Sequence, residues 1–473
     1  MVRVLYEWKN NVRKLCAVML VGIMCVAPVM AQEQVSNDYP SAWAMEAVME
    51  GQNYGIYPLT WHENFKAKIT KAQIATLKKG ISEKIQSISG VKLKENAIDE
   101  QVKGNTRGEV LRGLFLVLKN YEYPVDLGLD EIDAIEFMQK NNILSGNTKD
   151  FKLNRVCTIE EAIVFGTRIT DWVYNQLDAG SKGYFWKVEG GKNDVYLFGS
   201  IHAADVRLYP FAQEILEAYD TADVIGFEID TSDEADYNKF ANLALYDDGS
   251  SLKDHVSEET YDLLLSCKEA IGLTETQLNK FKVWYLSNYV STLSLSDIRE
   301  VEESQEAVEY GIDNYFFYKA YYDDKEIYPL ESYEIQAKMF DSFSDELQEY
   351  LLLGNLYNLL YSEDSSEALS EEEIKAMNDQ WLTLMKAGDI EGFKVYYDTS
   401  NVDLGNEVLT KEYIDKLLTN RDAKMAEKIE GCLNNETGNT YFIIVGAAHY
   451  ISARDNSVID QLKAKGYTVT QIK

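Results

Sequence analysis

The chain has 473 residues, of which 46% are hydrophobic, and a formal net charge of −32. This length and hydrophobic content indicate two or three folded domains and exclude a chain that is disordered throughout. The strong negative charge argues against nucleic-acid binding, because no basic surface is available to replace the counterions of the phosphates.

The first 31 residues have the composition of a secretory signal peptide. Basic residues precede an apolar run at 15–31, and the small residue Ala31 stands before an expected cleavage at Gln32. The alternative is a single membrane anchor, for which this run is at the short end of the lengths that span a bilayer. We therefore expect a secreted protein that is associated with the surface of a bacterial cell.

Three cysteines follow this segment, namely Cys157, Cys267 and Cys432. They are widely spaced and form no C-x-x-C pair, so they do not match a zinc or thiol-redox motif. We expect buried free thiols that pack as small hydrophobic side chains, while one disulfide remains an alternative.

Residues 32–182 are predicted to form a mostly helical domain. Three segments begin with a threonine that is followed three residues later by Gln or Glu, which is the pattern of a capping box at a helix start. The three pairs are Thr70 with Gln73, Thr106 with Glu109, and Thr158 with Glu161. Apolar residues at helical spacing follow each pair, so we expect three capped helices.

Residues 40–175 resemble S-layer homology repeats, in which Trp-Ala, Gly-Ile, Phe and Thr-Arg-Ala-Glu follow one another. The resemblance implies binding of cell-wall polysaccharide. Only Arg107 keeps the arginine of that pattern, whereas Lys71 and Ile159 replace it in the other two repeats. The alternative is a capped helical domain without any glycan contact.

A second domain of the α/β class is predicted at 183–473, with a mixed or parallel sheet and helical insertions. The order strand, helix, strand near its start favours a βαβ unit with parallel pairing. Acidic, helix-rich sequence fills 233–410, and an amphipathic helix at 411–433 carries Arg421. Strands are expected at 184–188 and 195–198, which form a hairpin, and at 222–230, 326–330 and 441–445.

Two of these apolar strands end in the same motif, Gly-x-x-His. The first runs from Tyr196 to His202 and the second from Tyr441 to His449, so two of the four histidines of the chain share one arrangement. We expect the glycine to let the backbone turn at the end of the strand. Each histidine then lies at the carboxyl edge of the sheet, where open α/β sheets bind ligands.

Glu228 follows the strand at 222–230 and is predicted to lie at the same edge. Two imidazoles and one carboxylate, His202, His449 and Glu228, suit a divalent ion such as Mn, Co, Zn or Fe, although ligands so far apart in sequence are a weak signal. With positions left for water, such a set is a hydrolytic metal site. A structural role for each histidine is the alternative.

The second domain also resembles the TraB/GumN/PrgY group, which is related to the Tiki proteases and to the erythromycin-esterase-like fold. The resemblance rests on the blocks GSIHAADVRLYP at 199–210, ADVIGFEID at 222–230, GID at 311–313, PLES at 329–332 and VGAAHY at 445–450. One departure is the sequence Ser-Ala-Arg at 452–454, in a loop where members of the group usually have a glycine.

The resemblance implies a metal-dependent peptidase in which His202 and His449 are metal ligands or polarising groups and Glu228 is a ligand or general base. Glu331 and Arg421 are further catalytic candidates: Glu331 could instead cap a helix, and Arg421 could instead pair with an acidic neighbour.

We therefore predict a secreted, metal-dependent hydrolase, a peptidase in the first instance, that acts on a peptide or protein. One alternative is a surface protein that binds and sequesters a peptide without cleaving it. Another is a protein whose function is to anchor to the cell wall through its N-terminal repeats.

Overall fold

The computed structural model describes residues 39–62, 64–97, 103–145, 151–298, 308–361, 371–396, 404–454 and 456–473. The predicted signal peptide at 1–31 lies outside these residues, so secretion stays a prediction. Contacts divide the chain into two compact units. The N-terminal unit holds the described residues up to 182 together with 206–216, and the C-terminal unit holds 183–205 and 217–473.

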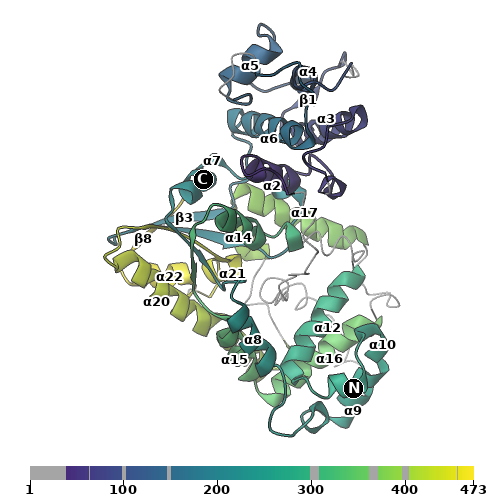
Figure 1. The fold of residues 1–473 in the computed structure, drawn as a ribbon. Helices are drawn as coiled ribbons and strands as arrows, with labels where there is room; N and C mark the ends of the chain where they lie inside the picture. The colour runs from purple at the N-terminus through teal and green to yellow at the C-terminus, as the bar shows by residue number, and fades with distance from the viewer. Residues whose placement is uncertain are drawn as a thin grey trace. The chain divides into compact units, whose positions relative to one another are not determined.

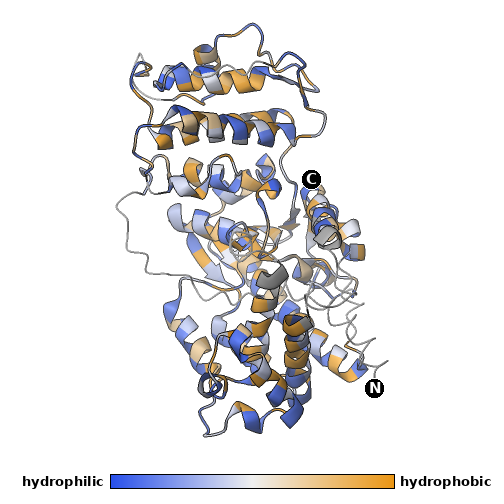
Figure 2. Ribbon diagram, turned by 90° about the vertical axis from the view of Figure 1, so that its right-hand side faces the viewer, coloured by the Kyte–Doolittle hydropathy of each residue, from blue (hydrophilic) through white to orange (hydrophobic). Residues whose placement is uncertain are grey.

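The N-terminal unit is helical, as predicted, and each of its helices carries both hydrophobic and hydrophilic residues (Figure 2). The three capping boxes are present at Thr70, Thr106 and Thr158, where each side chain accepts a hydrogen bond from the third helical residue. The elements are α2 (Met45–Asn53), η1 (Leu59–Trp61), α3 (Lys71–Gln86), β1 (Lys92–Leu93), α4 (Arg107–Lys119), β2 (Tyr121–Glu122), α5 (Ala134–Lys140), α6 (Ile159–Gln176) and η2 (Val206–Leu208).

The C-terminal unit contains a mixed, mostly parallel sheet of six strands in the order β6-β5-β7-β4-β3-β8 (Figure 1). Its strands are β3 (Tyr184–Glu189), β4 (Asp194–Ser200), β5 (Val224–Phe227), β6 (Glu326–Pro329), β7 (Thr440–Gly446) and β8 (Thr468–Gln471). The predicted hairpin is confirmed, since β3 and β4 pair antiparallel, while β6, β5, β7 and β4 run parallel to one another.

The prediction of a simple βαβ unit is wrong in one respect. The strands β4 and β5 are parallel, but they do not pair with each other, because β7 lies between them. Strand β7 is the most apolar segment of the sheet, and its residues 442–445 are fully buried. The centre of the sheet, which is covered on both faces, buries the most apolar surface. An apolar run such as β7 is therefore most stable at that position.

The two faces of the sheet bury different helices. On one face, Phe442 of β7 contacts Tyr219 of α7 (Gln213–Thr221) and Phe316 of α14 (Ile312–Tyr322). On the other face, the backbone of Ala447 in α21 (Ala447–Tyr450) approaches Gly199. A Cβ atom on Gly199 would lie 3.2 Å from the Cα atom of Ala447. Gly199 therefore lies inside β4 and permits close packing, instead of turning the chain at the strand end as we expected.

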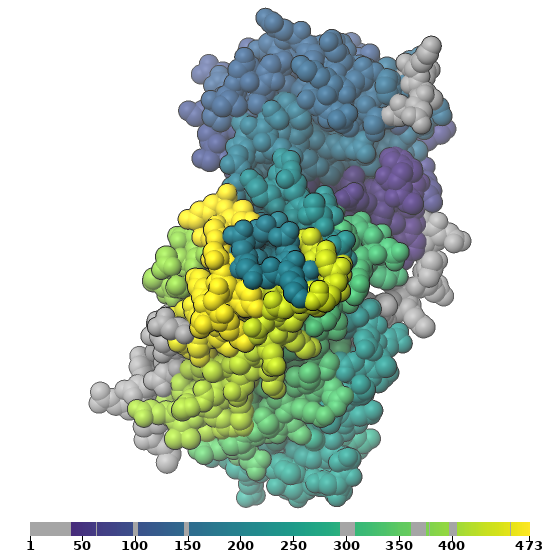
Figure 3. All heavy atoms as spheres, turned by 90° about the vertical axis from the view of Figure 1, so that its left-hand side faces the viewer, coloured from purple at the N-terminus to yellow at the C-terminus, as the bar shows by residue number. Residues whose placement is uncertain are grey.

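Residues near the C-terminus pack around the β3–β4 hairpin. Figure 3 shows the teal residues of the β3–β4 turn surrounded on this face by yellow C-terminal residues. Strand β8 pairs with β3, and the backbone N–H groups of Lys192 and Asn193 donate to the carbonyl of Leu433. Helices α20 (Asn420–Asn434) and α22 (Val458–Ala464) pack against each other beside the sheet (Figure 1).

The insertions between the strands are helical and form two further apolar clusters. Helices α12 and α16 pack against each other, and Trp284 of α12 contacts Phe240 of α8 and Phe340 of α15. These helices are α8 (Glu234–Leu243), η3 (Leu252–Asp254), α9 (Glu258–Ser266), α10 (Lys268–Ile271), α11 (Glu275–Leu278), α12 (Val283–Ile298), α15 (Tyr333–Asp341), α16 (Asp345–Tyr361), α17 (Glu371–Ala387), α18 (Ile390–Tyr396) and α19 (Glu407–Ile414).

Two findings bear on the predicted environment of the chain. Cys157, Cys267 and Cys432 are buried and free, which confirms the expected free thiols. Among the described residues, no helix combines the length and hydrophobicity needed to cross a membrane.

Two backbone segments approach each other so closely at Gly311, just before α14, that only a glycine fits there. A Cβ atom there would lie 2.3 Å from the carbonyl oxygen of His202. We therefore expect Gly311→Ala to lower the free energy of unfolding by about 1–3 kcal/mol, because the backbone must move. The matched control is Gly431→Ala in α20, where nothing lies within 4 Å of the added Cβ atom. That change should instead stabilise the helix by up to about 1 kcal/mol. Urea unfolding of both variants measures the difference, and equal stability of the two variants would contradict the prediction.

Candidate functional site

Four of the five predicted site residues follow parallel strands that end at one edge of the sheet. His202 follows β4, Glu228 follows β5 directly, Glu331 follows β6, and His449 lies in α21 after β7. Ser200 pairs with Gly446, and Phe227 pairs with Ile444, so these strand ends are in register. The carboxyl ends of the parallel strands therefore bring the four side chains to the same edge, where the sequence placed His202, Glu228 and His449.

The fifth residue, Arg421, connects two of these strand ends. Its Nε atom lies 3.0 and 2.9 Å from the two carboxylate oxygens of Glu331. Its Nη2 atom donates to Glu228 Oε2 at 2.7 Å and to Glu331 Oε2 at 2.8 Å. All three side chains are at most 10% exposed. A buried guanidinium thus neutralises two buried carboxylates that would otherwise repel each other.

The helix that carries Arg421 is not the regular helix we expected. A π-helical turn, η5 (Asp415–Thr419), joins α19 to α20, and Arg421 lies in the first turn of α20. The Nη1 atom of Arg421 donates to the carbonyl of Leu417 within this turn at 3.2 Å. Single π-turns widen a helix and change the direction of the side chains that follow, which is why they recur at functional sites.

His449 is held by a carboxylate that the sequence analysis missed. Its Nδ1 atom lies 2.6 Å from Asp422 Oδ1, and its Nε2 atom lies 3.8 Å from Glu228 Oε1. Asp422 is the neighbour of Arg421 in α20 and is completely buried. The same helix turn therefore anchors both Glu228 and His449.

His202 has a corresponding partner, Asp313 of α14, which the analysis also missed as a site residue. The two side chains form an ion pair with 2.8 Å between His202 Nδ1 and Asp313 Oδ2. The hydroxyl of Ser200 donates to Asp313 Oδ1 at 2.7 Å. The sequence signal was present, because Asp313 belongs to the GID block, and Asp422 directly follows Arg421.

Both imidazoles act on the charge of Glu228. Burial alone would raise the pKa of this carboxyl group, but the positive charge of Arg421 outweighs it, and the imidazoles of His449 and His202 add to this effect when they are protonated. The backbone N–H of Gly446 donates to Glu228 Oε1 at 2.8 Å and adds to the effect. The pKa of Glu228 is lowered to about 2. Glu228 is thus an anion at neutral pH with two imidazoles close to it.

The pKa of His202 shifts in the opposite direction. Burial favours the neutral imidazole, but the carboxylate of Asp313 outweighs this effect and raises the pKa of His202 to about 9. The side chain of His202 is 19% exposed, whereas that of His449 is 4% exposed. The two imidazoles therefore differ in environment although their sequence motifs are the same.

The side chains at this edge are of types that bind divalent metals, but as placed here they do not form a three-ligand group. Within the described ranges, no group of three or more His, Cys, Asp and Glu side chains is placed to hold a metal ion. Both oxygens of Glu228 already accept hydrogen bonds, one of them from the cationic Arg421. A guanidinium in contact with a ligand opposes a second cation at that place. The described residues thus show no three-ligand metal group, and a metal held by His202, Glu228 and His449 stays a prediction.

The other two histidines have structural surroundings. His255 stacks on Tyr246 with 4.5 Å between ring centroids, and its Nε2 atom lies 2.9 Å from the Ser250 hydroxyl. His62 packs against Phe65 in the N-terminal unit. Neither was assigned a role in the sequence analysis.

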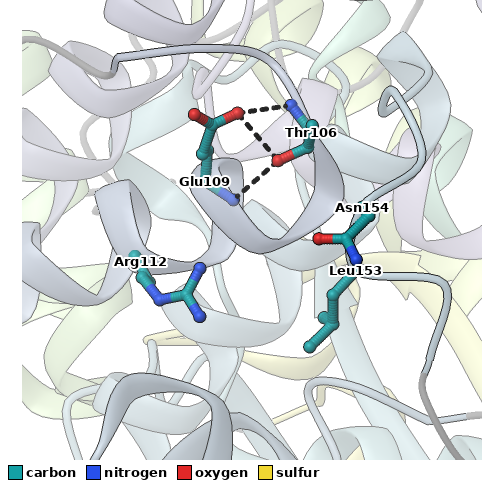
Figure 4. A pocket seen from close by; sticks show the side chains of 5 residues that line it. All are labelled: Thr106, Glu109, Arg112, Leu153 and Asn154. Atoms are coloured by element: carbon teal, nitrogen blue, oxygen red, sulfur yellow. Dashed lines mark hydrogen bonds between the residues drawn. The ribbon is translucent and has the colours of Figure 1, made fainter.

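In the N-terminal unit, Arg107 forms ion pairs inside the fold. It pairs with the buried carboxylate of Glu161, which also pairs with Arg155. A cavity of about 470 Å³ lies beside α4 and is lined by Thr106, Glu109 and Arg112, with residues 153–154 on its other side (Figure 4). The carboxylate of Glu109, one of these lining residues, accepts a hydrogen bond from the Thr106 hydroxyl at 2.7 Å. Polysaccharide binding through residues 40–175 stays a prediction.

Replacing Arg421 by Met tests the buried ion group. Two uncompensated carboxylates would remain, so we expect a loss of about 3–5 kcal/mol in the free energy of unfolding at pH 7. The pKa of Glu228 is lowered in the folded state, so its contribution is present above about pH 4.5 and is lost as the pH falls toward 2. The deficit should therefore shrink in acid. Urea unfolding at pH 7 and pH 3 measures this, with the exposed Lys338→Met as the matched control. A deficit that stays constant with pH would contradict the prediction.

Replacing Asp313 by Asn tests the imidazolium of His202. A raised pKa makes the contribution of this pair fully present below about pH 6.5 and lost as the pH rises through 9. The metal-free wild type should therefore lose stability across this interval, and Asp313→Asn should lose less. Thermal unfolding in metal-free buffer at pH 6, 8 and 10 measures both, and parallel curves for the two proteins would count against the pair.

Comparisons with known proteins agree with the extent of the C-terminal unit. The TraB/PrgY/gumN family model matches residues 184–471. Metalloprotease TIKI1 of Danio rerio is 24% identical over 305 residues, which cover 58% of this chain and 60% of that protein. Metalloprotease TIKI2 of Xenopus tropicalis is 24% identical over 318 residues, which cover 58% of this chain and 57% of that protein.

The chain thus spans less than two thirds of the length of these curated relatives. No solved structure matches it significantly. The relation to S-layer homology repeats and to the erythromycin-esterase-like fold stays a prediction. Since the family model covers more than half of the residues, this chain belongs to the TraB/PrgY/gumN family.

Proposed function

We propose that this protein is a metalloprotease-like hydrolase that acts on a peptide or protein substrate. The observation that carries the proposal is the pair of imidazoles, each held by a carboxylate through Nδ1, around the buried anion of Glu228. The relatives whose names include metalloprotease support the reaction class. Their low identity makes the site, and not the names, the basis of the proposal.

In this proposal the two imidazoles divide the proton transfers. A carboxylate at Nδ1 leaves Nε2 of His449 with its lone pair, so this atom takes a proton from an attacking water. The neighbouring charge of Glu228 then stabilises the imidazolium that forms. His202 is the more exposed imidazole, and with a pKa raised to about 9 it carries a proton at neutral pH to donate to the leaving amine.

The other two candidates take supporting roles in this proposal. The lowered pKa of Glu228 makes it a weak base, so it acts through its charge. Arg421 donates to both carboxylates and to a backbone carbonyl, which leaves it poorly placed to face an oxyanion. Glu331 holds Arg421 in place. A dependence of the activity on a Mn, Co, Zn or Fe ion is part of the proposal.

Peptide cleavage by the full chain tests the proposal. We expect turnover of a fluorogenic peptide library in buffers with Mn, Co, Zn or Fe, and a loss of about 10²–10⁴-fold in His202→Ala and in His449→Ala. His255→Ala is the matched control, since that side chain stacks on Tyr246 away from the sheet edge. Equal activity of all three variants would refute the assignment of the imidazoles.

A measurement of bound metal tests metal binding separately from peptide cleavage. The purified wild type is assayed for bound metal and compared with a double variant that lacks both His202 and His449. Full metal loading of the double variant would rule out these imidazoles as ligands, whatever the activity of the wild type.

A second candidate function is favoured by one observation. Glu228 is already held by Arg421 and by the N–H of Gly446, which suits a rigid binding surface as well as a reaction centre. The protein would then bind and sequester a peptide without cleaving it. Tight binding from the same library, without turnover in any of the metal buffers, would favour this candidate over the hydrolase.

A further inference from the structure

The carboxylate that holds His449 is itself held by an arginine. Asp422 is completely buried, and its Oδ1 atom lies 2.6 Å from His449 Nδ1. Its other oxygen, Oδ2, accepts a hydrogen bond from Arg454 Nη2 at 3.4 Å. Each oxygen of Asp422 thus has a separate partner, one from α21 and one from the loop after it.

Arg454 is fixed in this position by contacts at both of its ends. Its Nη1 atom donates to the Thr419 hydroxyl at 2.9 Å, at the junction of η5 and α20. Its Nε atom and its backbone N–H each donate to the Ser452 hydroxyl at 3.0 Å. The side chain is 11% exposed. The Ser-Ala-Arg loop, which departs from the expected glycine of the family, therefore ties the end of α21 to the start of α20.

The hydrogen bond from Arg454 determines which oxygen of Asp422 contacts His449. The guanidinium can only donate, so Oδ2 of Asp422 accepts from it and Oδ1 is left for His449 Nδ1. An ionised carboxylate can only accept a hydrogen bond, so this contact favours the tautomer of a neutral His449 that carries its proton on Nδ1. The Nε2 atom, which lies 3.8 Å from Glu228 Oε1, then presents its lone pair to the site.

We propose that Asp422 and Arg454 are positioning residues, and that Arg454 acts through Asp422 to keep His449 in the tautomer with Nε2 free. The expected effect on catalysis rests on the proposed function, whereas the expected tautomer of His449 does not. It adds two residues that the sequence motifs did not assign, and it gives the departing loop a role in the site.

The other imidazole supplies an internal comparison. His202 pairs with Asp313, whose second oxygen accepts from the neutral hydroxyl of Ser200 and not from a cation. No contact in the described residues connects Arg454 or Asp422 to this pair. A change at Arg454 or Asp422 should therefore alter the NMR signals of His449 and leave those of His202 unchanged.

Nitrogen-15 NMR of the full chain with labelled histidine tests the positioning directly, because only four histidines contribute signals. In the wild type at neutral pH we expect His449 to carry its proton on Nδ1. In Asp422→Asn the amide can donate to Nδ1, so the proton should move to Nε2. In Arg454→Met a part of this shift is expected, and Arg454→Lys should restore the wild-type signal because it restores a cation. Asp126→Asn, in an exposed turn of the N-terminal unit, is the matched control.

Kinetics supply the second readout. Asp422→Asn should lower kcat by about 10–100-fold with little change in KM, because orientation is lost and substrate contacts are not. Unchanged His449 signals in both Asp422→Asn and Arg454→Met would overturn the inference. A wild type without turnover would count against the proposed hydrolase, while the NMR result would still decide the positioning role. If Asp422→Asn fails to fold, Arg454→Met and its Lys rescue provide the same test.

Discussion

The guanidinium of Arg421 lies between two carboxylates at the ends of neighbouring parallel strands. Glu228 and Glu331 are both buried at this edge, and each would oppose the other without a cation. Because the cation comes from α20, the pair also fixes that helix against the sheet. Such a buried ion group contributes little net stability compared with apolar packing, so its main effect is to define one arrangement of the helix and the strand ends.

That arrangement decides where the imidazoles lie. Asp422 follows Arg421 in α20, so the helix that neutralises Glu228 also delivers the carboxylate that orients His449. His202 is oriented independently, through Asp313 of α14. The two identical motifs thus receive different surroundings: His449 is nearly buried between the carboxylates of Asp422 and Glu228, and His202 is partly exposed beside Asp313. Repetition in sequence has produced two chemically distinct groups at one edge.

Much of this edge could be predicted from local sequence. The apolar runs identified β3 to β7 of the six-stranded sheet, though not their exact lengths, and their ends placed His202, Glu228 and His449 together. Residues that act across the fold were not predictable in this way. Asp313 and Asp422 lie on helices, where an acidic residue is most often a solvated one, and only the pairing of helix with sheet reveals their partners. The π-turn before Arg421 and the insertion of β7 between β4 and β5 depend equally on tertiary contacts, which no periodicity records.

The central position of β7 has a consequence for how the molecule matures. This strand comes after β3, β4, β5 and β6 in the chain, yet it separates β4 from β5 and completes the interior of the sheet. Pairing over so many intervening residues is entropically slow, and the first half of the chain cannot build this sheet by itself. The candidate site residues that follow β4 and β5 therefore come together only after β7 has been made. A chain that ends before β7 therefore cannot assemble this edge of the sheet.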